Sequence, residues 1–295
     1  MGDSGEWCDY PLFPEVFRKA GYRVTFITNQ FLPQAKEAVY DFSGGFFLNN
    51  PVLDEAQFDV RNTSLHRYDD GVLADYDRLL RRGEISLDSA ADRNLIIMHL
   101  KGQHVAYDAR FPASRRKFLQ SQYMMPNLTR HDRQVMAHYD NATLYNDSIV
   151  DEILRRFEDE DAIVIYVPDH GEECYGDGLR VYGRLHSAEV DYRLAHEEFE
   201  IPFWIWCSRA YAEAHPGVMQ AIAGAKGRPL MTDRLAHTLL SLAGIACPYY
   251  REESDVLSPR YDSLRPRVLK NSVDYNKLKV EHENEQRAAG VAQPR

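Results

Sequence analysis

Four side chains that can bind metals or move protons lie close together in the segment DAIVIYVPDHGEECY, residues 161–175: Asp169, His170, Glu172 and Glu173. Adjacent Asp and His residues offer an oxygen and a neutral imidazole nitrogen, a ligand set that suits zinc better than magnesium or calcium. A catalytic zinc takes about three protein ligands and keeps one position open. The sequence therefore predicts half of a zinc site, which needs a partner from another part of the chain.

The residues before this cluster indicate where it lies in the fold. Residues 162–167 form a short run of β-branched and aromatic side chains without charge, which is typical of a strand buried on both faces of a sheet. In open α/β sheets, ligands bind beyond the carboxyl ends of the strands. We therefore expect Asp169 and His170 at the ligand-binding edge of such a sheet.

Polar side chains also follow two other predicted strands. Asn29 and Gln30 come directly after the strand at residues 23–28, where they could face a ligand or serve only the turn. The strand predicted at residues 94–100, NLIIMHL, is apolar enough to be buried in the sheet, and it leads into a loop that contains His104. A single loop histidine is more often a surface residue or a hydrogen-bonding group than a ligand. Both interpretations stay open for these residues.

Helices predicted between these strands complete the pattern. Apolar residues at helical spacing, with acidic residues at several starts and glycines at several ends, predict helices at residues 12–20, 69–82, 132–158 and 231–243, and a further buried strand is predicted at 201–206. Helices that alternate with strands favour a parallel sheet. The predicted fold class is α/β, with a mostly parallel central sheet flanked by helices on both faces.

Length and composition favour one large domain at residues 1–270, followed by a charged tail at residues 271–295 that forms either a peripheral helix or a frayed end. The chain has 295 residues, of which 44% are hydrophobic, and such a chain can bury a substantial core. No window approaches the roughly eighteen consecutive apolar residues of a membrane span. Residues 1–20 lack the basic start and apolar centre of a signal peptide. The sequence as given predicts a soluble chain without a targeting segment.

Charge and motifs exclude several other classes of function. The net charge of −10 argues against a nucleic-acid partner, because affinity for polyanions depends on Lys and Arg. One basic cluster, at Arg110, Arg115, Arg116 and Lys117, is interpreted as a solvated loop. The four cysteines form no CxxC pair, and no GxSxG segment follows a strand. Zinc-knuckle, thioredoxin-type and serine-hydrolase chemistry are therefore not predicted.

Several segments together resemble one protein family. The segments NLIIMHLKGQHVAYDARFP, YDNATLYNDSIVDEIL, IYVPDHGEE, EIPFWIW and TDRLAHTLLSLAGI occur in that order between about residues 12 and 267. This combination resembles the soluble catalytic domain of bacterial phosphoethanolamine transferases, which are sulfatase-like members of the alkaline phosphatase superfamily. The resemblance implies an enzyme of that fold with a zinc cofactor.

The resemblance also assigns roles to individual residues. It implies that Asp169 and His170 bind the catalytic zinc. His104, in an H-x-x-G-x-H pattern, would face the substrate phosphate or a second zinc. His186 matches a later active-site histidine of the family, and His196 is a competing match.

Other positions either match or depart from the family pattern. Asn29 and Gln30 resemble a polar pair of the family near the substrate head group. Pro168 stands where the family usually has Ser, at a position that is not a ligand. The family's threonine nucleophile and an acidic zinc ligand lie before the segment that matches residues 12–20. We therefore expect neither of them within this chain, nor the transmembrane anchor that would come earlier still.

The function that the resemblance implies is transfer of phosphoethanolamine from phosphatidylethanolamine to a lipid A or lipopolysaccharide core acceptor. In the full-length protein it would proceed through a phosphothreonine intermediate, because zinc lowers the pKa of the threonine hydroxyl. The implied location is the periplasmic domain of an inner-membrane protein, and the chain alone is expected to be inactive. The alternatives are a sulfatase-like phosphodiesterase or hydrolase, and a non-catalytic fragment of this fold.

Overall fold

The computed structural model describes residues 11–30, 58–88, 93–176, 181–184, 189–270 and 272–288, and the backbone of residues 40–42 and 46–48. These residues fall into two compact units. The first unit takes its residues from Ser4–Ala162 and Ser208–Tyr211, and the second unit takes them from Ile163–Cys207 and Ala212–Arg295.

The first unit alternates strands with helices and short 3-10 turns. Its elements in chain order are α1 (Phe13–Lys19), β1 (Arg23–Thr28), β2 (Tyr40–Phe42), β3 (Phe46–Leu48), β4 (Val60–Arg61), α3 (Asp70–Arg81), β5 (Asn94–His99), η2 (Tyr107–Ala109), η3 (Ala113–Arg115), η4 (Gln120–Gln122) and α4 (Arg130–Phe157). These bounds agree with the predicted elements to within about two residues where a prediction was made.

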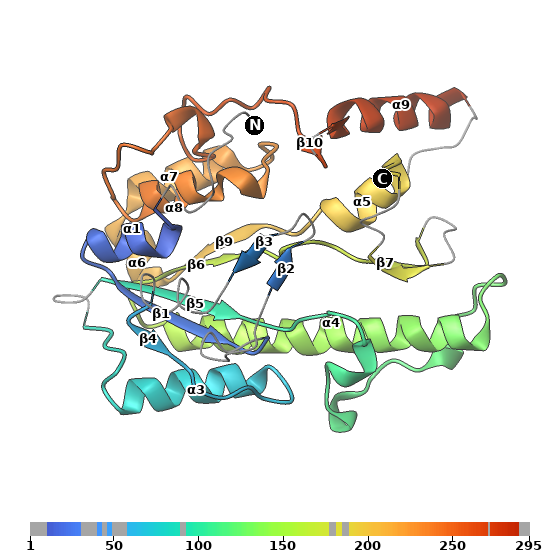
Figure 1. Ribbon diagram of the computed structural model, residues 1–295, viewed down its shortest axis with the longest axis horizontal. Helices are drawn as coiled ribbons and strands as arrows, with labels where there is room; N and C mark the ends of the chain where they lie inside the picture. The colour runs from blue at the N-terminus through green and yellow to red at the C-terminus, as the bar shows by residue number, and fades with distance from the viewer. Residues whose placement is uncertain are drawn as a thin grey trace. The chain divides into compact units, whose positions relative to one another are not determined.

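A parallel sheet with the strand order β4-β1-β5 forms the centre of the first unit (Figure 1). The register runs from Arg23 opposite Asn94 to Thr28 opposite His99, so β1 and β5 end at the same edge. Strand β1 is buried from its second residue onward because it has a neighbour on each side. The prediction of a fully buried strand at residues 94–100 is wrong, since β5 is half-buried and pairs within the described residues with β1 alone.

Helices flank this sheet and confirm the α/β class. Helices α1 and α3 both contact β1, and α3 also contacts the long helix α4 (Figure 1). The α3–α4 contact is fixed by Arg156, whose Nε and Nη2 donate to the two carboxylate oxygens of Asp77, each at 2.9 Å. Tyr76 and Phe157 pack beside this ion pair with ring centroids 5.5 Å apart. A bidentate pair between two helices fixes their register as well as their distance.

The second unit is built from short strands and helices. Its elements in chain order are β6 (Ile163–Tyr166), β7 (Glu173–Cys174), β8 (Tyr182–Gly183), α5 (Tyr192–Phe199), β9 (Trp204–Cys207), α7 (Pro216–Ala225), η6 (Thr232–Arg234), α8 (Leu235–Leu242), η7 (Glu252–Ser254), β10 (Val268–Leu269), β11 (Val273–Asp274) and α9 (Tyr275–Ala288), while α6 (Arg209–Ala214) contains residues of both units. Strands β6 and β9 pair antiparallel, and both are half-buried rather than fully buried as predicted.

Helix α9 belongs to the packing of the second unit. Its first residue, Tyr275, is 3% exposed and joins a hydrophobic cluster with Val190, Ala195 and Leu269. The Tyr275 hydroxyl also donates a hydrogen bond to the Glu200 carboxylate, just after α5. The residues that the sequence suggests as a charged tail therefore include a helix that contacts α5, and the domain division at residue 270 stays a prediction.

Candidate active site

The carboxyl ends of β1 and β5 bring two predicted site segments of the first unit side by side. The Thr28 hydroxyl lies 3.1 Å from His99 Nδ1 at the last register pair of the two strands. Gln30 is exposed, and its Nε2 donates to the Leu100 carbonyl at 2.9 Å. The edge of the parallel sheet thus holds the loop after β1 against the loop that leads to His104.

Asn29 connects three segments of this edge. The residue is fully buried, with 0% of its surface exposed. Its Nδ2 donates to Asp69 Oδ1 at 2.9 Å, and its Oδ1 accepts a hydrogen bond from the backbone nitrogen of His66 at 2.7 Å. Its backbone nitrogen donates to the His99 carbonyl at 3.0 Å. Both ends of the amide therefore hold neighbouring loops, and a contact between Asn29 and substrate stays a prediction.

Asp69 is the buried carboxylate beneath the same edge, and only 4% of the residue is exposed. Its Oδ1 accepts from Asn29 Nδ2 at 2.9 Å and from the backbone nitrogen of Lys101 at 3.1 Å, while Oδ2 accepts from the backbone nitrogen of Gly102 at 2.9 Å. Gly102 has a φ of +52°, a left-handed conformation that glycine adopts without steric cost. Asp69 thus fixes the backbone turn that leads from β5 to His104.

The side chain of Lys101, whose backbone nitrogen bonds to Asp69, carries a positive charge into the same region. Its Nζ donates to the His66 carbonyl at 2.9 Å. Burial lowers the pKa of Lys101 from its ordinary value, Arg110 lowers it further, and Asp69 acts in the opposite direction. The electrostatic environment of the Lys101 ammonium group therefore includes both the buried Asp69 carboxylate and the Arg110 guanidinium.

His104 has a defined ring tautomer. Its Nδ1 lies 2.5 Å from the Val105 carbonyl oxygen, which can only accept, so Nδ1 carries the hydrogen in the neutral ring. Nε2 is then left with a lone pair that can accept a proton or bind a metal. Arg110 supports this loop, since its Nε donates to the His104 carbonyl at 2.7 Å and its Nη2 donates to the Val105 carbonyl at 3.0 Å.

Asp169 and His170 turn toward each other in the second unit, directly after β6. Asp169 Oδ2 lies 3.4 Å from His170 Nε2, and Asp169 Oδ1 accepts from the backbone nitrogen of His170 at 3.1 Å. The Asp169 side chain is 79% exposed, whereas that of His170 is 18% exposed. His170 Nδ1 lies 2.8 Å from the Gly171 carbonyl, so in the neutral ring Nδ1 carries the hydrogen here as well.

These two side chains fit two positions of a zinc site. In a tetrahedral site with bonds of about 2.0–2.1 Å, two ligand atoms lie about 3.3–3.4 Å apart. The Oδ2–Nε2 distance of 3.4 Å matches that spacing. An Nδ1 hydrogen given to a backbone carbonyl is also the usual support of a zinc-binding imidazole. Across the described ranges between residues 11 and 288, no group of three or more His, Cys, Asp or Glu side chains could hold a metal.

Arg184 contacts the same imidazole. Its Nη1 lies 2.8 Å from His170 Nε2, and because a guanidinium only donates, Nε2 is the acceptor. The antiparallel pair β7–β8 brings Arg184 back to this point, with Glu173 opposite Gly183 and Cys174 opposite Tyr182. A cation thus lies at the nitrogen that zinc would use.

Gly171 ties the Asp169–His170 pair to helix α5. Its backbone nitrogen donates to the Glu198 carbonyl at 2.9 Å. A Cβ at this position would lie 2.1 Å from the Glu197 carbonyl oxygen, so only glycine allows this approach. Helix α5 therefore determines where the backbone of the pair lies.

Of the two remaining candidate histidines, His186 and His196, the structure describes only His196. His186 lies outside the described residues, so its predicted role stays a prediction. His196, the competing match, lies on α5 with its Nδ1 3.1 Å from Glu200 Oε2 and its ring stacked on Tyr192 at 5.8 Å. Its side chain is 43% exposed, and Tyr192, on which it stacks, also stacks on His282 of α9 with ring centroids 4.3 Å apart.

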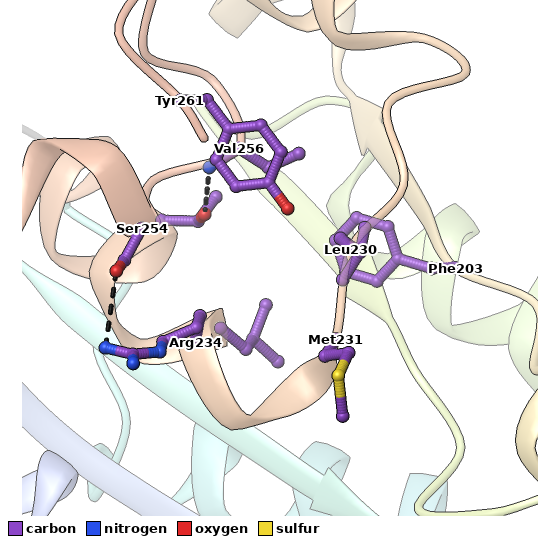
Figure 2. Close-up of a pocket in the computed structure, with 9 residues that line it drawn as sticks. Phe203, Leu230, Met231, Arg234, Ser254, Val256 and Tyr261 are labelled. Atoms are coloured by element: carbon purple, nitrogen blue, oxygen red, sulfur yellow. Dashed lines mark hydrogen bonds between the residues drawn. The ribbon is translucent and has the colours of Figure 1, made fainter. Parts of the chain in front are cut away.

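A small pocket in the second unit is lined by none of the predicted site residues. Figure 2 shows its lining, which consists of Phe203, Leu230, Met231, Arg234, Leu235, Thr238, Ser254, Val256 and Tyr261. Its polar groups bond locally, since the Val256 nitrogen donates to Thr238 Oγ1 at 3.1 Å and the Tyr261 hydroxyl donates to the Pro229 carbonyl at 2.6 Å. We assign this pocket to the packing of α8 and its neighbouring turns.

The family follows from a comparison with known proteins. The profile of one family, described as Sulfatase, matches residues 4–245, which is most of the chain. The chain belongs to the sulfatase family. The strand-end position of Asp169 and His170 therefore lies within the sulfatase match.

Curated relatives of this sulfatase-family chain are named as phosphoethanolamine transferases. Phosphoethanolamine transferase EptC of Escherichia coli is 27% identical over 254 residues, which cover 85% of this chain and 41% of the relative. Phosphoethanolamine transferase CptA of Salmonella typhimurium is 27% identical over 260 residues, with the same two coverages of 85% and 41%. The sulfatase-family chain thus spans about two-fifths of the length of these relatives.

Solved structures show the same fold. The C-terminal periplasmic domain of EptC from Escherichia coli matches with a TM-score of 0.69 and 27% identity, covering 88% of this chain and 70% of that chain, and its complex with Zn matches equally well. The soluble domain of lipooligosaccharide phosphoethanolamine transferase A from Neisseria meningitidis, at 22% identity and a TM-score of 0.59, supports the fold alone. Within the described part of the sulfatase-family chain, no helix has the length and apolar character needed to cross a membrane.

Sequence reasoning missed three residues that contact candidate site residues, two in the first unit and one in the second. In the sequence, Asp69 is one of the acidic residues that mark a helix start. Only the fold shows that its carboxylate accepts from the backbone of the loop that leads to His104. Arg110 was grouped with a solvated basic cluster, although its guanidinium holds the backbone of His104. Arg184 reaches His170 through the β7–β8 pairing, and short strands of two residues leave no alternating pattern to detect.

Proposed function

We propose that this chain contributes the catalytic domain of a zinc-dependent phosphoethanolamine transferase. The reaction would move phosphoethanolamine from phosphatidylethanolamine to a lipid A or lipopolysaccharide core acceptor, through a phosphothreonine intermediate. The observation that carries the proposal is the 27% identity to two phosphoethanolamine transferases over 85% of the chain. The periplasmic location of the solved EptC domain supports the same location for this chain, as part of an inner-membrane protein.

The proposed zinc ligands are Asp169 and His170. The 3.4 Å spacing of Oδ2 and Nε2 supports them, as does the relative solved with Zn. Bound zinc would supply positive charge that lowers the pKa of a hydroxyl nucleophile and offsets charge on phosphoryl oxygens. We assign neither the nucleophile nor the further zinc ligands to any of the described residues.

The other proposed roles concern the substrate. His104 would face the phosphate, where its Nε2 lone pair could hold or release a proton. His186 would be a second active-site histidine. Gln30 is exposed at the strand end and would contact the head group, while the buried Asn29 would reach it through the loops that its amide holds. The positive charge of Lys101 and Arg110 near His104 would favour an anionic substrate at this edge.

A donor assay with and without acceptor tests the proposed reaction. Because the chain alone is expected to be inactive, the full-length protein that contains it is loaded with zinc and incubated with phosphatidylethanolamine that carries a fluorescent acyl chain, and formation of diacylglycerol is followed. A transferase is expected to form diacylglycerol much faster when lipid A is present and to yield lipid A with added phosphoethanolamine mass. Release at the same rate without acceptor would favour the hydrolase alternative, and no release by the full-length protein under either condition would contradict both enzymes.

Arg184→Ala is expected to raise the affinity for zinc about two- to fivefold, because an exposed charged contact contributes up to about 1 kcal/mol. The substitution removes a cation whose Nη1 lies 2.8 Å from the proposed ligand atom Nε2. Zinc affinity is measured by competition with a chromophoric chelator, which requires no turnover. Arg209→Ala, in the same chain but on α6, serves as the control. Weaker zinc binding in Arg184→Ala would show instead that Arg184 helps to position His170.

A further inference from the structure

A basic and apolar surface lies between η3 and α4 of the first unit, and we call residues 113–130 the basic segment. Large apolar side chains in it point into solvent: Met124 is 80% exposed, Leu119 is 53% exposed and Met125 is 47% exposed. Arg115, Arg116, Lys117 and Arg130 are exposed in the same segment. Contiguous exposed apolar patches rimmed by polar residues mark interaction surfaces, whereas apolar side chains exposed singly are ordinary, so the grouping of three within seven residues is the observation that counts.

The charge of the basic segment is opposite to that of the chain. The four basic residues from 113 to 130 are accompanied by no Asp or Glu, so this stretch has a charge of +4 within a chain of net charge −10. The nearest carboxylates that follow are turned to internal partners. Asp132 Oδ2 accepts from the backbone nitrogen of Thr129 at 2.8 Å, and the Asp140 carboxylate accepts from the Tyr123 hydroxyl.

The backbone of the basic segment is held in place by α4. Asn141, on α4, is 0% exposed and accepts at Oδ1 from the backbone nitrogens of Lys117 at 2.6 Å and Phe118 at 2.9 Å. Its Nδ2 donates to the Phe118 carbonyl at 2.9 Å. Turn η4 also contacts α4. The backbone just before the exposed methionines is therefore bonded to α4 at residues 117 and 118 and contacts that helix again at η4.

We propose that the basic segment docks onto the surface of an anionic phospholipid bilayer. Apolar side chains of the Met and Leu type enter the boundary between head groups and acyl chains, and Lys and Arg beside them bind anionic head groups. The absence of acidic residues from the segment matches a surface of one sign, and the acidic remainder of the chain would be repelled by it. A protein partner would need an acidic face of its own, which makes it an outcome of the test below.

The docking proposal rests on the proposed function, because a phosphatidylethanolamine donor resides in a membrane. It adds a contact that lies in the same unit as His104. The segment follows directly on the Arg110 loop, and η2 also contacts α4, which carries the Asn141 support. The surface would therefore hold the first unit at the lipid that contains the donor, without a membrane-spanning helix in the described residues.

Vesicle co-sedimentation tests the docking proposal with the 295-residue chain. The probes are vesicles of phosphatidylcholine with or without phosphatidylglycerol, in the absence of zinc. Binding is expected only to the anionic vesicles and should weaken as salt is raised. A variant with Arg115→Ser, Arg116→Ser and Lys117→Ser should bind roughly a hundredfold more weakly, at about fivefold for each basic side chain. Met124→Gln should weaken binding several-fold at constant charge.

Matched substitutions separate the segment from the rest of the surface. Leu264 is 89% exposed, so Leu264→Gln is the control for Met124→Gln. Lys19, Arg82 and Arg155 have 70%, 63% and 61% exposed side chains, so their joint change to Ser is the control for charge. Equal binding by the basic-segment variants and the parent chain overturns the proposal. So does binding to lipopolysaccharide micelles or a protein without binding to anionic vesicles. Because no zinc or turnover is involved, either result leaves the proposed transfer reaction standing.

Discussion

Replacing Asp169 by Asn is expected to remove zinc binding and the transfer activity together. The substitution keeps the shape of the side chain but removes the negative charge that would face zinc. Because changes outside the ligand shell already weaken metal binding by about 10- to 100-fold, loss of a ligand should weaken it by at least about a hundredfold. Loss of positive charge at the developing phosphoryl charge should lower the transfer rate by about 100- to 1000-fold. Zinc content after dialysis measures the first effect in this chain, and the diacylglycerol assay measures the second in the full-length protein.

The geometry around Asp169 makes this substitution a clean test. The side chain is 79% exposed, so Asp169→Asn should leave the free energy of unfolding within about 0.5 kcal/mol of the parent value. Asp151→Asn on α4 is the control, since its side chain is 55% exposed and pairs only with Arg155 among the ion pairs described. Unchanged zinc content in Asp169→Asn would refute the proposed ligand, whatever happens to the activity.

Replacing Asp69 by Ala is expected to lower the free energy of unfolding by roughly 3 kcal/mol. The reason is that three donors, the amide of Asn29 and the backbone nitrogens of Lys101 and Gly102, lose a buried charged acceptor. Hydrogen bonds to charged groups contribute about 1.5–3 kcal/mol each when their loss leaves a buried donor unsatisfied, and the effects of neighbouring bonds do not simply add. Urea unfolding followed by circular dichroism measures the change.

Two further variants and a hydrogen-exchange measurement decide whether Asp69→Ala acts on the His104 loop. Asp147→Ala, at an exposed position on α4, should change the free energy of unfolding by less than about 0.5 kcal/mol. Asp69→Asn should recover part of the loss, because its oxygen can still accept from one or two of the donors. Amide hydrogen exchange at Lys101 and Gly102 should become faster in Asp69→Ala. An unchanged exchange rate at both amides would mean that the carboxylate does not hold this loop.

The sequence contained enough information for the elements but not for their burial. Strand β1 was predicted at its observed bounds because a β-branched run with no glycine or proline leads straight into polar residues. Helix α4 begins at a capping box of Thr129 and Asp132, three residues apart, which places its start two residues before the predicted one. The half-burial of β5, β6 and β9 could not be predicted, because burial depends on which strands pair and the pattern of one strand does not reveal its neighbours.

The sequence could suggest a candidate site only where adjacent residues carry the chemistry. The Asp169–His170 pair stands out as two adjacent letters after a strand, and the structure places Oδ2 and Nε2 3.4 Å apart, while their role as zinc ligands stays a prediction. Contacts between distant segments were not predictable. Asp69 and Gly102 are 33 residues apart, and Arg184 follows His170 by 14 residues through a hairpin of two-residue strands. Such contacts depend on the fold that brings the segments together.

The close approach of Gly171 to α5 also affects how this region tolerates change. The pair of proposed ligands is anchored by a backbone bond from Gly171 to Glu198, across 27 positions of the chain. Insertions or deletions after the β7–β8 pairing could therefore accumulate in a lineage, or be introduced by loop grafting, while the ligands kept their place. Variation at position 171 itself is limited by the Glu197 carbonyl, which would lie 2.1 Å from any Cβ. In a mutational library around this site, many substitutions should be tolerated at Arg184. At Gly171, glycine alone should survive selection.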